Sequence, residues 1–213
     1  MFLVAAILGL LVISSFTQAQ LEDLEDPLEE ESVDVYTQAQ LAELCHREVD
    51  QGYECYLPKP QIRYHYDNTT NECLSFLYKG CGGNINNYKE HSRCESVCKK
   101  GYDIPPCVDK KPPTGICHIM RPTCPEGSIC KYGMSYDGVC CEYETEGQYR
   151  KEWKPKCDSG KVLITYDSGP KWVPLLGKKC SYEFCPERAD CIEGKWFAHC
   201  CGSEERFGPE KLY

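Results

Sequence analysis

The sequence predicts a small, disulfide-rich fold built from three cysteine modules. Of the 213 residues, 18 are cysteines, and they fall into three consecutive groups of six. An even count at this density is typical of secreted chains in which disulfides replace a large hydrophobic core. The sequence has only five scattered histidines and no Cys-x-x-Cys pair, which argues against structural zinc. We therefore expect disulfides and neither a metal nor another cofactor.

An apolar leader opens the chain. Phe2 to Ile13 is a run of twelve apolar residues, and small residues precede a possible cut after Ala19. The run is too short to span a bilayer, so we predict a signal peptide over residues 1–19, a secreted protein and no membrane partner. The competing interpretation is a transmembrane helix, because no Lys or Arg precedes the run.

An acidic segment follows the leader. Residues 22–34 contain eight carboxylates and no base, so they account for nearly all of the formal charge of −9. The remainder is close to neutral, which argues against nucleic acid as a partner. We predict a flexible acidic tail over residues 20–44 that serves as a spacer or cleaved propeptide, with a short helical turn over residues 40–44 leading into Cys45. The alternative is weak attraction to Ca²⁺ or to a mineral surface through clustered carboxylate oxygens.

The first cysteine group predicts a hairpin and a helix. Aromatic-rich runs over residues 62–66 and 74–78 are separated by a polar turn, which indicates a β-hairpin. Residues 89–99 place Cys94 and Cys98 on one face of a short helix. The last three gaps between these cysteines are seven, twelve and three residues, around the segment Phe76-Leu-Tyr-Lys-Gly-Cys-Gly-Gly-Asn-Ile-Asn-Asn-Tyr88.

This segment resembles a Kunitz (bovine pancreatic trypsin inhibitor type) domain over residues 45–98. The resemblance implies an α+β fold with a twisted β-hairpin and a C-terminal helix. It also implies three disulfides: Cys45–Cys98, Cys55–Cys81 and Cys73–Cys94.

The same resemblance implies a protease-binding loop made of Tyr56, Leu57 and Pro58. Tyr56, which follows the second cysteine, would be the primary specificity residue, and an aromatic ring suits a chymotrypsin-like pocket better than a trypsin-like one. The loop departs from the family. It is two residues longer, Leu57 stands where Gly or Ala is usual, and Pro58 lacks a backbone N–H that normally donates to the protease.

The second and third cysteine groups form an internal repeat over residues 107–141 and 157–201. Both contain Cys-Pro-Glu-x-x-x-Cys and both end in Cys-Cys. The two modules resemble the lustrin-type cysteine-rich repeats of invertebrate extracellular-matrix proteins. Adjacent cysteines pair with each other only through a strained ring, so we expect each to bridge elsewhere; about 12 connectivities per module remain open. We expect residues 99–106 and 142–156 to be linkers, the second exposed because it is rich in charge.

Other motifs add little chemistry. The sequon Asn68-Thr-Thr falls on the predicted hairpin turn and is a candidate glycosylation site. The sequence has no nucleophile elbow, His-Glu-x-x-His or phosphate-binding loop, so we expect no enzyme activity. We expect the histidines to serve in packing or on the surface, with His65 stacking inside the hairpin.

The sequence therefore predicts a secreted, small disulfide-rich protein with a Kunitz domain and two cysteine-rich modules. We expect a serine protease inhibitor that prefers chymotrypsin-like enzymes and acts within an extracellular matrix. The alternative is a non-inhibitory structural component of a calcified shell or other extracellular matrix, as in mollusc shell-matrix proteins. Its expected partners are a serine protease and a matrix or mineral surface. Ion-channel blocking, a third use of the Kunitz fold, is disfavoured because the module is not notably basic.

Overall fold

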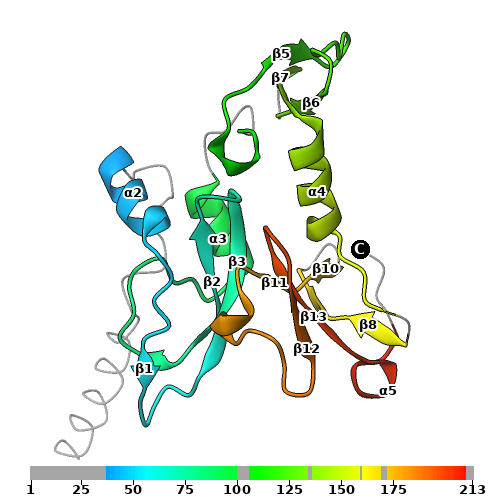
Figure 1. Ribbon diagram of the computed structural model, residues 1–213. Helices are drawn as coiled ribbons and strands as arrows, with labels where there is room; N and C mark the ends of the chain where they lie inside the picture. Colours follow the sequence, from blue (N-terminus) through cyan, green and yellow to red (C-terminus); the bar gives the residue numbers. More distant parts are fainter. Residues whose placement is uncertain (1–36, 100–105, 134–135, 159, 169–171, 210–213) are drawn as a thin grey trace, which may run out of the picture. The chain divides into compact units, whose positions relative to one another are not determined.

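The computed structural model describes residues 37–99, 106–133, 136–158, 160–168 and 172–209 (Figure 1). The expected signal peptide, all of the acidic tail before Thr37 and most of the linker over 99–106 lie outside these residues. The elements of the first module are α2 (Gln38–His46), β1 (Tyr53–Glu54), β2 (Gln61–Asp67), β3 (Glu72–Tyr78), β4 (Gly80–Cys81) and α3 (His91–Cys98).

Helix α2 contains the helical turn predicted over residues 40–44 and begins two residues earlier, so residues 38–44 are not part of a flexible tail. Residues from Gln38 onward are helical, and the cause is a capping box. The Thr37 hydroxyl accepts a hydrogen bond from the Gln40 backbone N–H at 3.3 Å, and the Gln40 side-chain oxygen accepts one from the Thr37 N–H at 2.8 Å. Two N–H groups that the first turn leaves free are thereby satisfied.

The hairpin and the three disulfides of the first module agree with the implied Kunitz fold. Strands β2 and β3 pair antiparallel from Gln61↔Tyr78 to Asp67↔Glu72. Phe76 on β3 is completely buried. The disulfides are those that the resemblance implies, Cys45–Cys98, Cys55–Cys81 and Cys73–Cys94.

The second and third modules have the same disulfide connectivity. In each, the first cysteine bonds to the sixth, the second to the fourth and the third to the fifth. The bonds are Cys107–Cys141, Cys117–Cys130 and Cys124–Cys140 in one module, and Cys157–Cys201, Cys180–Cys191 and Cys185–Cys200 in the other. The prediction that adjacent cysteines bridge elsewhere is confirmed. Each adjacent pair lies on a strand, where successive side chains point to opposite faces and so reach different partners.

The two modules are built on small antiparallel sheets. The second contains the 3-10 turn η2 (Val108–Lys110) and a sheet of order β5–β7–β6, whose strands are Gly115–His118, Asp137–Glu142 and Ser128–Tyr132. The third contains β8 (Lys161–Leu163), β9 (Thr165–Asp167), β10 (Trp172–Pro174), β11 (Leu176–Gly177), η3 (Cys180–Tyr182), β12 (Asp190–Glu193), β13 (Ala198–Ser203) and α5 (Glu204–Phe207).

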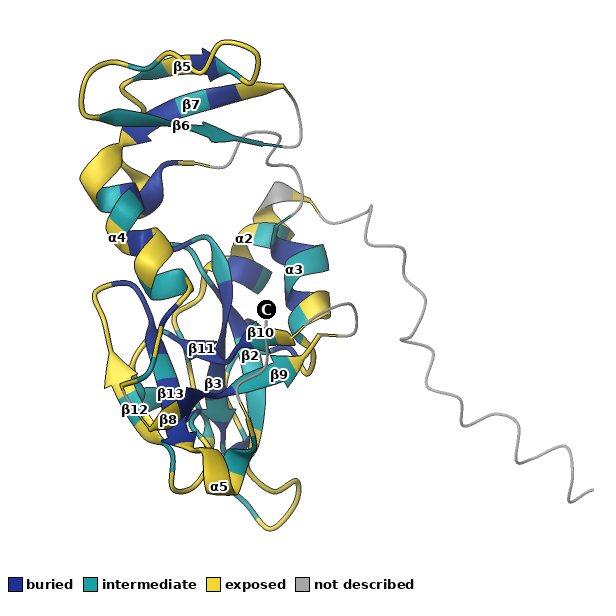
Figure 2. Cartoon of the chain, turned by 90° about the vertical axis from the view of Figure 1, so that its right-hand side faces the viewer, coloured by how far each residue is buried: buried dark blue, intermediate teal, exposed yellow. Residues whose placement is uncertain are grey.

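The expectation of an exposed linker over residues 142–156 is wrong. Helix α4 (Tyr143–Trp153) occupies most of it, with one face buried and the other exposed (Figure 2). The buried face carries Glu146, Tyr149 and Trp153, spaced three and four residues apart as one face of a helix requires. The high charge of the segment concealed this spacing, because most of its charged residues lie outside the buried face and Glu146 on that face is itself a charged residue.

The third module and the hairpin of the first module share one sheet. The sequence had predicted the two modules as separate units. The strand order is β12–β13–β11–β3–β2, and Gly177 of β11 pairs with Ser75 of β3 in parallel. A common apolar cluster surrounds this join. Its buried members are Leu74, Val108, Tyr149, Leu176, Trp196 and Phe197.

Polar contacts also cross the join. Lys178 forms an ion pair with Asp67 at 3.0 Å. The Gln51 side-chain amide donates both to the Leu77 carbonyl and to the Tyr182 carbonyl, each at 3.1 Å. These bonds connect the first module to the third at several points. The two modules therefore share an interface and are not independent domains.

None of the helices in the described part of the chain has the length and apolar character needed to cross a lipid bilayer.

Gly177 gives a test of the packing around β11, the strand that joins the two modules. A Cβ there would lie 2.3–2.7 Å from ring atoms of the completely buried Phe184. We expect Gly177→Ala to destabilise the protein by about 1–3 kcal/mol through overpacking. The measurement is guanidinium unfolding with all disulfides intact.

Gly147 in α4 supplies the matched control, because its Cβ position has no atom within 4 Å. Gly147→Ala should stabilise the protein by about 0.5–1 kcal/mol, the ordinary gain from removing a helix glycine. Equal effects from the two substitutions would contradict the close packing at Gly177.

Candidate protease-binding loop

The predicted protease-binding loop connects β1 to β2 and is anchored at its start. Strand β1 pairs with β4, with Tyr53 opposite Cys81 and Glu54 opposite Gly80. The disulfide Cys55–Cys81 lies directly after this pairing, with the two Cα atoms 5.9 Å apart. The loop therefore departs from a short sheet reinforced by a covalent bond.

Gly80 allows the loop to rest on β4. Its φ is +120°, a conformation that favours glycine, and a Cβ would lie 2.3 Å from the carbonyl oxygen of Pro58. The backbone of the loop and the backbone of β4 thus meet without a side chain between them. The sequence analysis did not single out this glycine for that role.

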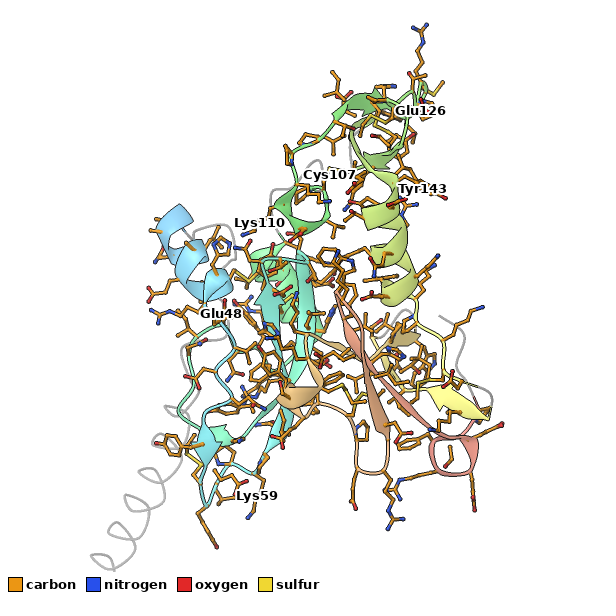
Figure 3. The ribbon with its side chains drawn as sticks, viewed as in Figure 1. Glu48, Lys59, Cys107, Lys110, Glu126 and Tyr143 are labelled. Atoms are coloured by element: carbon orange, nitrogen blue, oxygen red, sulfur yellow. A yellow bond between two sulfur atoms is a disulfide. The ribbon has the colours of Figure 1, made fainter. Side chains whose placement is uncertain are left out.

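The side chains of the loop project into solvent. Tyr56 is 87% exposed and Leu57 67% exposed. The ammonium of Lys59 lies 5.8 Å from the centroid of the Tyr56 ring, within range of a cation–π contact. Figure 3 labels Lys59 at the projecting end of the loop. Pro58 follows a cis peptide bond and offers no backbone donor.

Asn86 supports the module from inside and was missed by the sequence analysis. It is 1% exposed, and its amide nitrogen donates to the carbonyls of Cys45, Arg47 and Tyr66 at 3.2, 2.8 and 3.0 Å. Its side-chain oxygen accepts from the Tyr66 N–H at 2.8 Å. One amide therefore ties the end of α2 to strand β2. The segment between Gly83 and Tyr88 contains three asparagines, and no signal in the sequence marks one of them as buried.

His65 lies inside the hairpin, as expected of a stacking residue. Its ring meets the rings of Phe76 and Tyr182 edge-on, with centroids 5.7 and 6.2 Å away, and the side chain is 3% exposed. Burial lowers the pKa of His65 to about 4, against the opposing attraction of Asp67. The neutral ring is therefore the form that fits the join between the first and third modules.

A separate ionic cluster lies on helix α3. Lys99 pairs with Glu95 at 3.0 Å and also with Glu72, while His91 lies 3.4 Å from Glu95. The hydrogen bond from His91, with help from Lys99, lowers the pKa of Glu95 to about 2. These groups fasten α3 to β3 and are not part of the protease-binding loop.

The sequon lies on the hairpin turn, and α4 contacts that turn. Asn68 is half-buried, and Thr70 is 4% exposed. The Thr70 hydroxyl donates to Asp67 at 2.6 Å, and its carbonyl accepts from the Tyr149 hydroxyl at 3.1 Å. Glycosylation of Asn68 stays a prediction, and an enzyme would have to reach it beside this packed turn.

Three groups of side chains in the described residues are close enough together to hold a metal ion, and each contains disulfide-bonded cysteines. They are Cys117, Cys124 and Cys140; Cys157, His199 and Cys201; and Cys107, Cys141 and Glu146. A metal needs the thiolate form of cysteine, and these sulfurs are oxidised.

Comparison with known proteins agrees with this geometry. Residues 44–99 match the Kunitz/bovine pancreatic trypsin inhibitor domain. The chain is 37% identical over 168 residues to the major allergen Ani s 1 of Anisakis simplex, covering 74% of this chain and 86% of that one. The chain belongs to the Kunitz/BPTI family.

Two further relatives show how far the likeness extends. A BPTI/Kunitz inhibitor domain-containing protein of Caenorhabditis elegans is 32% identical over 158 residues, which is 74% of this chain and 88% of that protein. BPTI/Kunitz domain-containing protein 3 of the mollusc Margaritifera margaritifera is 40% identical over 60 residues, 28% of this chain and 38% of that protein. The mollusc likeness therefore extends over little more than the length of the Kunitz domain, whereas the two nematode proteins align over most of their length.

The buried His65 predicts a pH dependence of stability. Because its folded pKa of about 4 lies below the usual 6.5, the unfolded chain takes up a proton first as pH falls. Stability should therefore decline by about 3 kcal/mol between pH 6.5 and pH 4 from this residue. His65→Phe should remove that part of the decline, as measured by guanidinium unfolding at several pH values. At pH 8 the ring is neutral in both states, so the difference there reports packing alone. A wild-type and variant decline of equal size would contradict the assignment.

Proposed function

We propose that this Kunitz-family chain is a secreted serine protease inhibitor and that Tyr56 is its primary contact with the protease. The observation that carries the proposal is the position of Tyr56, 87% exposed and next to the Cys55–Cys81 disulfide. A side chain presented on a loop that is already ordered loses little conformational entropy when it binds.

The chemistry of Tyr56 favours a chymotrypsin-like enzyme. A trypsin-like pocket contains a carboxylate that pairs with Lys or Arg, and a tyrosine would leave that charge unpaired. An apolar pocket instead accepts the ring and buries it. Lys59 does not change this preference, because its ammonium lies over the Tyr56 ring and Pro60 follows it in the chain.

Pro58 should weaken the inhibition. Pro58 has no backbone N–H to donate to a carbonyl of the protease. Leaving that carbonyl without a hydrogen bond in a buried interface reduces the binding free energy by about 1–3 kcal/mol. The same residue supports the alternative function, a non-inhibitory structural component of an extracellular matrix. In that case the Kunitz fold would serve as a scaffold, and its two repeat modules would be the parts that meet the matrix or mineral surface.

The proposal includes secretion and a place in an extracellular matrix. It also includes the domain boundaries at residues 45–98, 107–141 and 157–201. Nine disulfides over the described chain support an oxidising compartment. In both repeat modules the disulfides close within the proposed boundaries.

A specificity exchange tests the proposal. The wild-type chain should inhibit chymotrypsin more strongly than trypsin. The substitution Tyr56→Lys should weaken inhibition of chymotrypsin and strengthen inhibition of trypsin, each by at least about tenfold, because a charge-matched pocket is worth more than about 1.4 kcal/mol. The measurement is the inhibition constant for each enzyme.

Tyr136→Lys is the matched control, because Tyr136 is also exposed, at 70%, but belongs to the second module. It should change neither constant. If wild type and Tyr56→Lys both fail to inhibit either enzyme while remaining folded, the inhibitory function is absent and the scaffold alternative holds.

A further inference from the structure

The solvent face of helix α4 carries a cluster of positive charges. Arg150, Lys151, Lys154 and Lys156 lie within seven residues, and all four are exposed. We call these four residues the basic stripe. The three on or at the end of the helix project within about 100° of one another, away from the buried face that contains Tyr149 and Trp153. Figure 2 shows this exposed side of α4.

The one acidic residue inside the stripe is turned away from it. Glu152 accepts hydrogen bonds from the backbone N–H groups of Trp196 and Phe197 at 2.6 and 3.3 Å. Its other carboxylate oxygen accepts from Gln148 at 3.3 Å. The negative charge is therefore used to hold the turn between β12 and β13, and it does not neutralise the neighbouring cations by direct pairing.

Within the described residues, no member of the stripe forms an ion pair, whereas five lysines elsewhere do. The paired lysines are Lys99, Lys111, Lys131, Lys161 and Lys178. A further exposed cation lies on the turn between β12 and β13. Lys195 is exposed on the turn that Glu152 holds, and its ammonium lies 4.7 Å from the centroid of the Trp196 ring.

Helix stability explains only part of this arrangement. Arg150 and Lys151 lie in the last turn, where positive charge interacts favourably with the helix dipole. Lys154 is the C-cap, Lys156 lies beyond the helix, and Lys195 belongs to another element. The helix dipole does not account for Lys156 or Lys195, and repulsion among the clustered cations of the stripe is a cost unless an anion offsets it.

We propose that the basic stripe binds a sulfated glycosaminoglycan. The cations lie on an exposed helix face and its flank rather than in a cavity, which suits a linear polyanion better than a small enclosed anion. Sulfate esters stay ionised at all physiological pH values, and a polyanion releases counterions when several cations neutralise it together. Since the chain outside its acidic tail is close to neutral, the attraction comes from this local cluster and not from net charge.

The test is the affinity of the full chain for heparin, measured at several NaCl concentrations. The variant Arg150→Gln, Lys151→Gln, Lys154→Gln removes three cations and keeps residues of good helix propensity. We expect at least a tenfold loss of affinity, and a slope of log K against log[NaCl] that is smaller by about 2–3, close to one unit per lost contact. Circular dichroism checks that the variant remains folded.

The matched control is Arg93→Gln, Arg121→Gln, Arg188→Gln, which removes the same charge from three exposed residues on other elements. It should leave the affinity within about twofold, since distant surface charges are screened. An equal loss in the two variants, or no binding of the wild type at low salt, would overturn the proposal.

Two competitors separate the possible occupants. Hyaluronan, which carries carboxylates and no sulfate, should displace heparin poorly. A peptide of residues 22–34 tests whether the stripe instead holds the acidic tail of the chain itself. If that peptide, or hyaluronan, displaces heparin as well as free heparin does, the proposed preference for sulfate is wrong.

Discussion

Backbone pairing between Gly177 and Ser75 is the contact on which the arrangement of the first and third modules depends. It places β11 against β3, and this brings Leu176 and Phe197 onto Leu74 in one apolar cluster. The absence of a side chain at Gly177 lets the ring of Phe184 approach to within van der Waals contact of the strand. Modules of this size bury little surface alone, so a shared cluster adds stability that neither could supply.

The disulfides stabilise the modules in a different way. In each repeat one disulfide joins the first cysteine to the last and so closes the module. The other two disulfides are shorter in sequence and interleave inside it. The chain-entropy account attributes the gain chiefly to the unfolded state, where a closed loop has fewer conformations. Apolar contacts at the join act on the folded state. The described chain therefore combines covalent closure inside its modules with noncovalent packing between the first and the third.

Much of the fold could be predicted from the local spacing of residues in the sequence. The hairpin over residues 62–78, the helix holding Cys94 and Cys98, and the divergent partners of Cys140 and Cys141 all follow from periodicity and cysteine position. The exposed Tyr56 lies on the loop where the family resemblance implied it would. What these features share is that they depend on residues close in sequence or on a strong motif.

Contacts between distant segments were not predictable in the same way. The join of β3 and β11 connects residues about one hundred positions apart through backbone atoms, and backbone pairing has no side-chain signature. Helix α4 was hidden because its buried face includes Glu146, whose carboxylate accepts from the Val108 N–H and pairs with Lys131. A buried charge with its partners in another segment reads as a polar surface residue. Asn86 was missed for the same reason.

The shared sheet has a consequence for how the family domain is delimited. Residues 44–99 match the family as a stretch of sequence, yet β3 within that stretch has a partner strand from the third module. A chain cut after residue 99 would present the outer backbone groups of β3 and the side chain of Leu74 to water. Such an open strand edge beside an apolar patch is a template for pairing with other chains. The segment that can be recognised in the sequence is thus smaller than the unit that covers this strand edge and buries Leu74.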